Sequence, residues 1–201
     1  MITRKRICST AIGVLSLILT TAASAADSVG FPGKVSEARS PNGLYAVKNV
    51  EQPEPGNPGY FKHYLFFTRK GQKAQAPLKL ITSGTNSYER CIEILWSPDS
   101  AAFALNDWMG SNVASVFLYR VNDLKHPIEP KLWDALSKRD KRRIDKSHCV
   151  YWSARKWIGP TMLELKVYAD AQGTGTLHYS WDLRKNSFKF DRRGFGEDKD
   201  D

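Results

Sequence analysis

Hydrophobic and aromatic residues alternate with polar ones over short stretches along most of the chain. Clusters of Gly, Pro, Asn and Ser separate these stretches. A period of two with turn residues at both ends is typical of β-strands that bury one face. We therefore predict strands over residues 35–39, 44–50, 60–69, 78–82, 92–96, 102–105, 115–119, 161–169 and 177–183.

Two similar turns join neighbouring predicted strands. One lies in Trp96-Ser97-Pro98-Asp99-Ser100 and the other is Ser40-Pro41-Asn42-Gly43, and the two serines are 57 residues apart. Proline presets φ in such a turn, and an Asp or Asn side chain hydrogen-bonds the backbone just beyond it. Ser153 follows 56 residues after Ser97, so we predict three copies of one β-meander, the third of them degenerate. Chance similarity among meanders is the alternative.

One segment has a helical pattern instead. Pro130 precedes apolar residues at Leu132, Trp133, Leu136 and Ile144, a spacing that fits one face of a helix. Proline suits the first turn of a helix and cations suit the last. We expect one inserted helix, about 131–146, in an otherwise mainly β domain of antiparallel meanders with a propeller-like or sandwich-like arrangement.

The two turns resemble the Ser-Pro-Asp-Gly repeats of TolB-type and related β-propeller proteins. In that family the turn joins the first two strands of a blade, so the resemblance implies about three blade-like units over residues 40–183. Three blades are fewer than the usual minimum for a closed ring. Such a fragment would need caps, a partner chain or a sandwich-like packing to protect its edges.

The N-terminus has the pattern of a secretory signal peptide. Arg4-Lys5-Arg6 precedes an apolar run, and Ala23-Ser24-Ala25 supplies small residues for cleavage near Ala25. A membrane anchor, the alternative, needs a longer apolar run. We expect residues 1–25 to be removed, residues 26–190 to form one β-rich domain, and residues 191–201 to be a disordered charged tail. The mature protein would be periplasmic or secreted and would not span a membrane.

Two cysteines remain after such cleavage. Cys91 and Cys149 would be exposed to an oxidising compartment, where an even pair is more often bridged than free. We predict a Cys91–Cys149 disulfide, with two buried thiols as the alternative.

Basic residues crowd the second half of the predicted helix. The whole chain has a formal net charge of +9, which falls to +6 without the signal peptide. An anionic partner, either an envelope protein or an anionic polymer, is the functional interpretation of this charge, and a solvated helix face is the structural one. Export argues against nucleic acid. The predicted contact residues are Lys138, Arg139, Arg142, Arg143 and Lys146.

A polar segment at 106–112 lies between two predicted strands, and we predict that it is a ligand-binding loop. Its side chains combine a stacking ring with hydrogen-bonding groups, which suits a sugar or an aromatic ligand. A turn with its tryptophan folded onto the core is the alternative. The predicted ligand-binding residues are Asn106, Asp107, Trp108, Ser111 and Asn112.

No motif in the sequence indicates catalysis or a cofactor. The four histidines have no zinc-ligand spacing, and a nucleophile elbow and a phosphate-binding glycine loop are absent. We therefore expect no cofactor, no metal and no catalytic residue that the sequence identifies. The sequence favours an exported binding or protein-interaction module, and an exported hydrolase with a dispersed acid/His site is the alternative.

Overall fold

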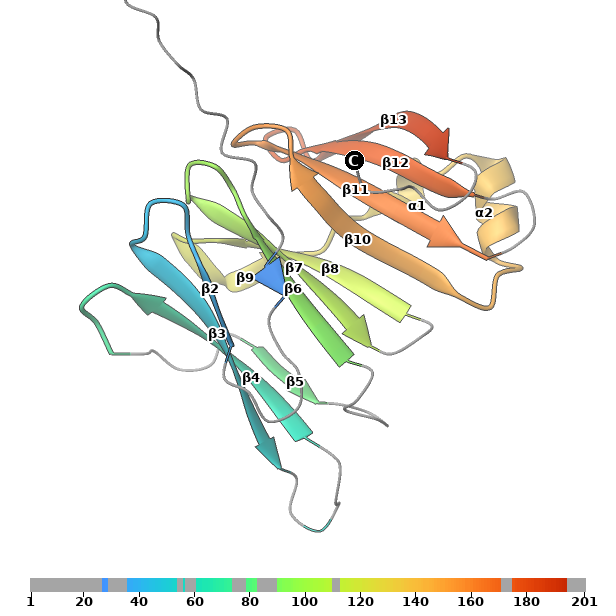
Figure 1. The fold of residues 1–201 in the computed structure, drawn as a ribbon. Helices are drawn as coiled ribbons and strands as arrows, with labels where there is room; N and C mark the ends of the chain where they lie inside the picture. Colours follow the sequence, from blue (N-terminus) through green and yellow to red (C-terminus); the bar gives the residue numbers. More distant parts are fainter. Residues whose placement is uncertain are drawn as a thin grey trace, which may run out of the picture.

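The computed structural model describes residues 27–28, 36–53, 56, 61–73, 79–82, 90–109, 113–170 and 175–194. The predicted signal peptide lies outside these residues, and so does most of the predicted tail. The described chain is mainly β, as the sequence predicts, and its strands run as three consecutive antiparallel meanders (Figure 1).

Each meander has four strands, and we call the meanders the first, second and third units. The first unit is β2 (Ser36–Arg39), β3 (Tyr45–Pro53), β4 (Phe61–Arg69) and β5 (Lys79–Thr82). The second is β6 (Arg90–Trp96), β7 (Ala102–Met109), β8 (Val113–Arg120) and β9 (Asp123–Ile128). The third is β10 (Val150–Trp157), β11 (Met162–Ala169), β12 (Thr176–Asp182) and β13 (Ser187–Gly194).

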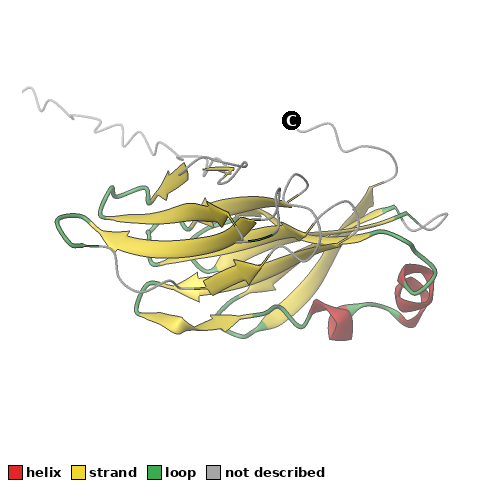
Figure 2. Cartoon of the chain, turned by 90° about the horizontal axis from the view of Figure 1, so that it is seen from below, coloured by secondary structure: helices red, strands yellow, loops and turns green. Residues whose placement is uncertain are grey.

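The units are connected differently at the two boundaries between them. The first unit is a separate sheet, whereas a short parallel pairing of β8 with β10 joins the second unit to the third. A short strand, β1 (Asp27–Ser28), pairs with β6. Two helices, α1 (Leu132–Ala135) and α2 (Lys138–Ile144), lie together at one side of the strands (Figure 2). The sequence predicted a single helix here, but Leu136 adopts an extended conformation and divides it.

The two Ser-Pro turns have the same hydrogen bonds. Ser40 Oγ contacts Asn42 Oδ1 at 2.8 Å and the Tyr45 backbone N–H at 3.0 Å. Ser97 Oγ contacts Asp99 Oδ1 at 2.6 Å and the Ala102 backbone N–H at 3.0 Å. The position after the Asn or Asp has a positive φ in both turns, 66° and 59°. The repeat that the sequence indicates is therefore real at the level of backbone geometry for the first two units.

The third unit repeats the backbone contact without the serine. Ile158 N–H donates to Met162 O at 2.8 Å, as Ser40 and Ser97 donate to the carbonyls of Tyr45 and Ala102. Ser153, which the sequence aligned with Ser97, instead lies inside β10. The alignment by serine was wrong, because the third turn is built around Gly159 with a φ of 133°.

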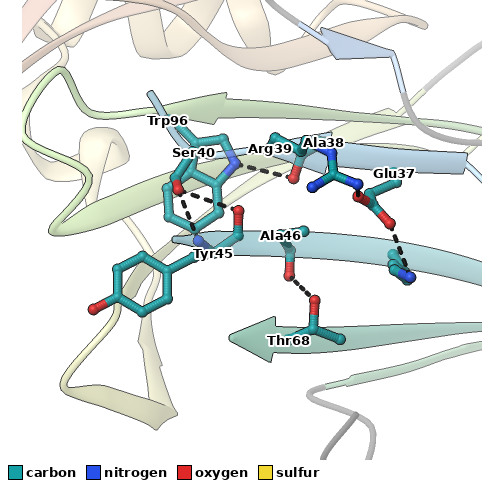
Figure 3. Close-up of polar contacts among 9 residues, drawn as sticks. Glu37, Ala38, Arg39, Ser40, Tyr45, Ala46, Thr68 and Trp96 are labelled. Carbon is teal, nitrogen blue, oxygen red and sulfur yellow. Dashed lines mark hydrogen bonds and ion pairs between the residues drawn. The ribbon is translucent and has the colours of Figure 1, made fainter. Parts of the chain in front are cut away.

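A tryptophan at the end of a first strand links each unit to the preceding one. Trp96 Nε1 donates to Ala38 O at 3.3 Å (Figure 3), and Trp157 Nε1 donates to Leu95 O at 3.0 Å. Ala38 and Leu95 occupy equivalent positions, two residues before the turn serine. One interaction therefore holds both unit boundaries.

Hydrophobic cores fill both boundaries. Val47, Leu65 and Phe67 of the first unit pack against one face of the second, which includes Phe103 and Tyr119. The opposite face of the second unit packs against the third unit and the helices. Burying both faces of the second unit removes most of its apolar surface from water, which is the main driving force for this arrangement.

The outward faces of the first and third units combine charged and aromatic side chains. On the first unit, Glu37 pairs with Arg39 (Figure 3) and with Lys48, and the ring centroids of Tyr64 and Phe66 lie 6.5 Å apart on the same face. On the third unit, Glu164 pairs with His178, and Tyr168 is 40% exposed. The three units form a stack without a closed ring.

The strand order does not support the predicted Cys91–Cys149 disulfide. Cys91 lies opposite Trp108, and the row continues across the sheet to Tyr151, two residues after Cys149. Cys91 and Tyr151 are therefore three strand spacings apart, about 14 Å. The Cα atoms of bridged cysteines lie about 4.4–6.8 Å apart. No disulfide is found within the part of the chain that the structure describes.

The predicted disordered tail begins too early. Residues 191–194 belong to β13, which pairs with β12 along the edge of the third unit. These residues form a strand because their backbone groups pair with β12, and the charged composition of the segment does not prevent this pairing. Residues 195–201 lie outside the described residues.

Candidate functional site

The predicted binding loop at 106–112 is in part a strand. β7 continues to Met109, and Asn106 and Asp107 are 0% and 2% exposed. The side chain of Asn106 hydrogen-bonds Glu93 at 3.0 Å and both the carbonyl and the N–H of Ala154, at 2.8 and 2.7 Å. Asn106 therefore ties β7 to β10 of the third unit. Ser111 and Asn112 lie outside the described residues.

Trp108 is half-buried and belongs to a row of rings. Its ring centroid lies 5.7 Å from that of Tyr151, which in turn lies 5.8 Å from that of Tyr168. Trp108 Nε1 is buried and has no hydrogen-bond partner among the described residues. The ring packs against its neighbours instead of standing alone on a loop, so the predicted stacking platform is replaced by an aromatic contact between the units.

The basic residues of α2 face outward. Lys138, Arg139 and Arg142 are exposed, as is Lys146 just after the helix, and Arg143 is half-buried. Leu132, Leu136 and Ile144 are buried in the core between the second and third units, as the predicted apolar stripe requires. Trp133 does not belong to this stripe, because it is 40% exposed and has Lys141 Nζ 6.0 Å from its ring centroid.

A buried carboxylate holds α2 against the third unit. Asp140 forms an ion pair with Arg193 of β13 and also accepts from Ser137 Oγ at 2.7 Å, while Ser137 Oγ caps the helix by accepting from the N–H of Asp140. Burial alone would raise the pKa of Asp140. The hydrogen bonds from Arg193 and Ser137, together with the charges of Arg193 and Arg143, hold that pKa below its ordinary value. Asp140 is therefore charged at neutral pH, and its contact fixes the direction in which the basic face points.

The outward face of the third unit contains a buried His–acid pair. His178 Nδ1 lies 2.9 Å from Glu164 Oε1, and Lys156 and Arg192 lie within ion-pair distance of the same carboxylate. Thr176 and Ser180 are the hydroxyls nearest to His178 in sequence on this face, and Ser180 donates to Asp191 Oδ2 at 2.5 Å.

Neither a metal site nor a membrane-spanning helix emerges from the described residues. They contain no group of three or more His, Cys, Asp and Glu side chains that could hold a metal ion. Within the same residues, no helix is both long and apolar enough to cross a membrane.

Sequence reasoning missed a cleft of about 840 Å³ at the end of the stack where the Ser-Pro turns lie. All three units contribute to its walls, and the lining includes Arg69, Arg120 and Arg184. The sequence signal that could have revealed the cleft is the repeated position of two arginines. Arg69 and Arg120 each end the third strand of their unit, just before a polar turn. Only the stacking of the units brings these turns together.

Comparisons with known proteins give little further guidance. No protein-family model matches the chain, and no curated protein has a matching sequence. A solved structure from a study of two prolyl endopeptidases aligns with 78% of this chain at 11% identity and a TM-score of 0.46. The alignment covers 21% of that protein, so this chain spans about a fifth of its length. A likeness of this size supports no inference about activity.

Proposed function

We propose that this protein is an exported, soluble binding module of the cell envelope, and that the outward face of α2 holds an anionic polymer or an acidic protein. One observation carries the proposal: three exposed cations, Lys138, Arg139 and Arg142, share one short helix, and a fourth, Lys146, follows just after its end. Only Asp134 and Asp145 add exposed negative charge within the two helices and their caps. Export is proposed from the N-terminal sequence alone.

The anchoring of α2 supports this proposal. A solvated basic segment needs no fixed orientation, whereas α2 is held by a buried ion pair between Asp140 and Arg193 and by the burial of Ile144. A fixed array of cations loses less conformational entropy on binding than a mobile one. Charge-driven association of this kind is fast and weakens as salt rises.

A relationship to TolB-type proteins is also part of the proposal. This part of the proposal rests on the two Ser-Pro turns, whose hydrogen-bond networks at Ser40 and Ser97 match each other. They describe the units and do not identify a ligand.

The test is a titration of the mature protein with heparin, as a defined sulfated polymer, and with polyglutamate, as a defined acidic polypeptide. Lys138→Gln/Arg142→Gln removes two charges from α2, and Lys73→Gln/Lys125→Gln is the matched control because both of its lysines are exposed outside the helices. Each cation near an anionic surface contributes about 1 kcal/mol. The α2 variant should therefore bind at least one polymer about 10- to 30-fold more weakly than wild type.

The control variant should lose less than about threefold, since it changes only the overall charge. Equal losses in both variants would mean that net charge, and not α2, governs binding. No binding of wild-type protein to either polymer at low salt would refute the proposal.

A further inference from the structure

Three arginines from three different units line the cleft at the turn end of the stack. Arg69 ends β4, Arg120 ends β8, and Arg184 lies in the turn after β12. The residue that follows each third strand donates its N–H to the residue before the second strand of the same unit. These bonds are Lys70 to Leu44 at 2.8 Å, Val121 to Ala101 at 2.9 Å and Leu183 to Thr161 at 3.0 Å. Equivalent backbone contacts thus fix the position of each turn.

The acid in the cleft lining offsets only part of the positive charge of these arginines. None of the three guanidinium groups forms an ion pair within the described residues, and Arg120 donates only to Leu183 O, at 3.5 Å. The acid in the cleft lining is Asp99, whose Oδ1 already accepts from Ser97 Oγ at 2.6 Å and from the Ala101 N–H at 3.1 Å. Like charges around one cleft repel one another, so an anion that enters relieves this repulsion.

The floor of the cleft is apolar and aromatic. Tyr45 and Phe67 line it, with ring centroids 5.4 Å apart, and Val121 and Leu124 extend the apolar surface toward the second unit. Phe67 is buried, with 5% of its surface exposed, whereas Tyr45 is half-buried. In Figure 3 the Tyr45 ring extends away from the hydrogen bonds of the Ser40 turn. Ligand sites combine such an apolar floor with a few polar groups that fix orientation.

We infer that this cleft binds a small ligand that has a carboxylate or phosphate group attached to an aromatic or apolar part. The anionic group lies among Arg69, Arg120 and Arg184, because guanidinium groups bind carboxylate and phosphate oxygens with two hydrogen bonds at once. The apolar part lies against Tyr45 and its neighbours. The site is separate from the surface of α2 and does not depend on the function proposed for that surface.

The experiment uses phenyl phosphate and benzoate as probes, with inorganic phosphate and phenol as the two halves of the first probe. Binding is followed by calorimetry and by the amide NMR signals of Asn122 and Thr161, which line the cleft. Phenyl phosphate should bind with a Kd in about the millimolar range and each half at least about fivefold more weakly. Comparison with benzoate distinguishes a phosphate site from a carboxylate site.

Arg69→Gln/Arg120→Gln should weaken binding of the preferred probe about tenfold or more. Lys138→Gln/Arg142→Gln also removes two positive charges, but from α2, and its Kd for the probe should stay within about twofold of the wild-type value. Arg69→Gln alone is the second variant, since the exposed Arg69 side chain forms no ion pair within the described residues, and it should weaken binding at least about threefold. The inference is overturned if neither probe shifts the Asn122 and Thr161 signals, or if the α2 variant loses as much binding as the cleft variants.

Discussion

Replacing Asn106 with leucine tests whether this residue joins the second and third units or serves a ligand. The amide is fully buried and makes three hydrogen bonds, to Glu93 and to both backbone groups of Ala154. Leucine has the same branched shape, with two methyl groups in place of the amide oxygen and nitrogen, so Asn106→Leu removes the hydrogen bonds without opening a cavity. Three bonds at about 1 kcal/mol each give a loss of about 3 kcal/mol.

The loss should exceed this sum, because Ala154 N–H and C=O would stay buried without a partner. With that penalty the expected loss is about 4 kcal/mol in the free energy of unfolding, which corresponds to a fall in Tm of about 10 °C for a domain of this size. Urea unfolding followed by tryptophan fluorescence measures it. Asn122→Ala is the control, since Asn122 is exposed in a turn, and it should change stability by less than about 0.5 kcal/mol. A loss below about 1 kcal/mol for Asn106→Leu would refute the structural role.

Three further predictions concern buried polar groups and thiols. The Tyr119 hydroxyl is buried without a hydrogen-bond partner in the described chain, so Tyr119→Phe should raise stability by about 1 kcal/mol in urea unfolding at pH 7. Burial, with a smaller contribution from Asp107, raises the pKa of Tyr119 to about 12, whereas the phenol of the unfolded chain ionises near 10. Wild type should therefore lose stability as pH rises from 10 to 12, and the Tyr119→Phe variant should lose less. Asp140→Asn should lower stability by about 1–3 kcal/mol at pH 7, because it removes the ion pair with Arg193. Because the folded pKa of Asp140 lies below its ordinary value of 3.8, that difference should shrink as pH falls below about 4, and an unchanged difference at pH 3 would contradict the assignment. Finally, Cys91 and Cys149 of the chain without residues 1–25, unfolded without reductant, should both react with iodoacetamide in a mass-spectrometric assay, and a protected pair would contradict the strand order.

The parts of the fold that depend on neighbours in sequence could be predicted. Alternation of polar and apolar residues located most strands, and the Ser-Pro turns at Ser40 and Ser97 form because each serine hydroxyl and the following Asn or Asp bond their own turn. The burial of Leu132, Leu136 and Ile144 was also expected from helical spacing, although Leu136 divides the predicted helix and Trp133, which the predicted stripe included, is exposed.

Contacts between units could not be predicted in the same way. Asn106 and Asp107 have the composition of a loop, yet β7 continues through them because Asn106 bonds the backbone of β10, 48 residues away. The third repeat was aligned on Ser153, whereas Trp157 is the residue that repeats the role of Trp96. The tryptophan contact connects different units, so the local pattern around either residue does not reveal it.

The two candidate sites also differ in whether their residues are neighbours in sequence. The basic run at residues 138–146 was visible in the sequence because its cations are adjacent, and the structure shows that four of them are exposed. The arginine cleft was not visible, because Arg69, Arg120 and Arg184 are separated by more than fifty residues and meet only through the stacking of the units.

The central claim is that the basic face of α2 binds an anionic component of the envelope. The most direct measurement is capture from an envelope extract by immobilised wild-type protein and by Lys138→Gln/Arg142→Gln, each at low and at moderate salt. Wild type should retain a component at low salt that moderate salt releases and that the variant fails to retain. Retention of the same components by both proteins, independent of salt, would contradict the central claim.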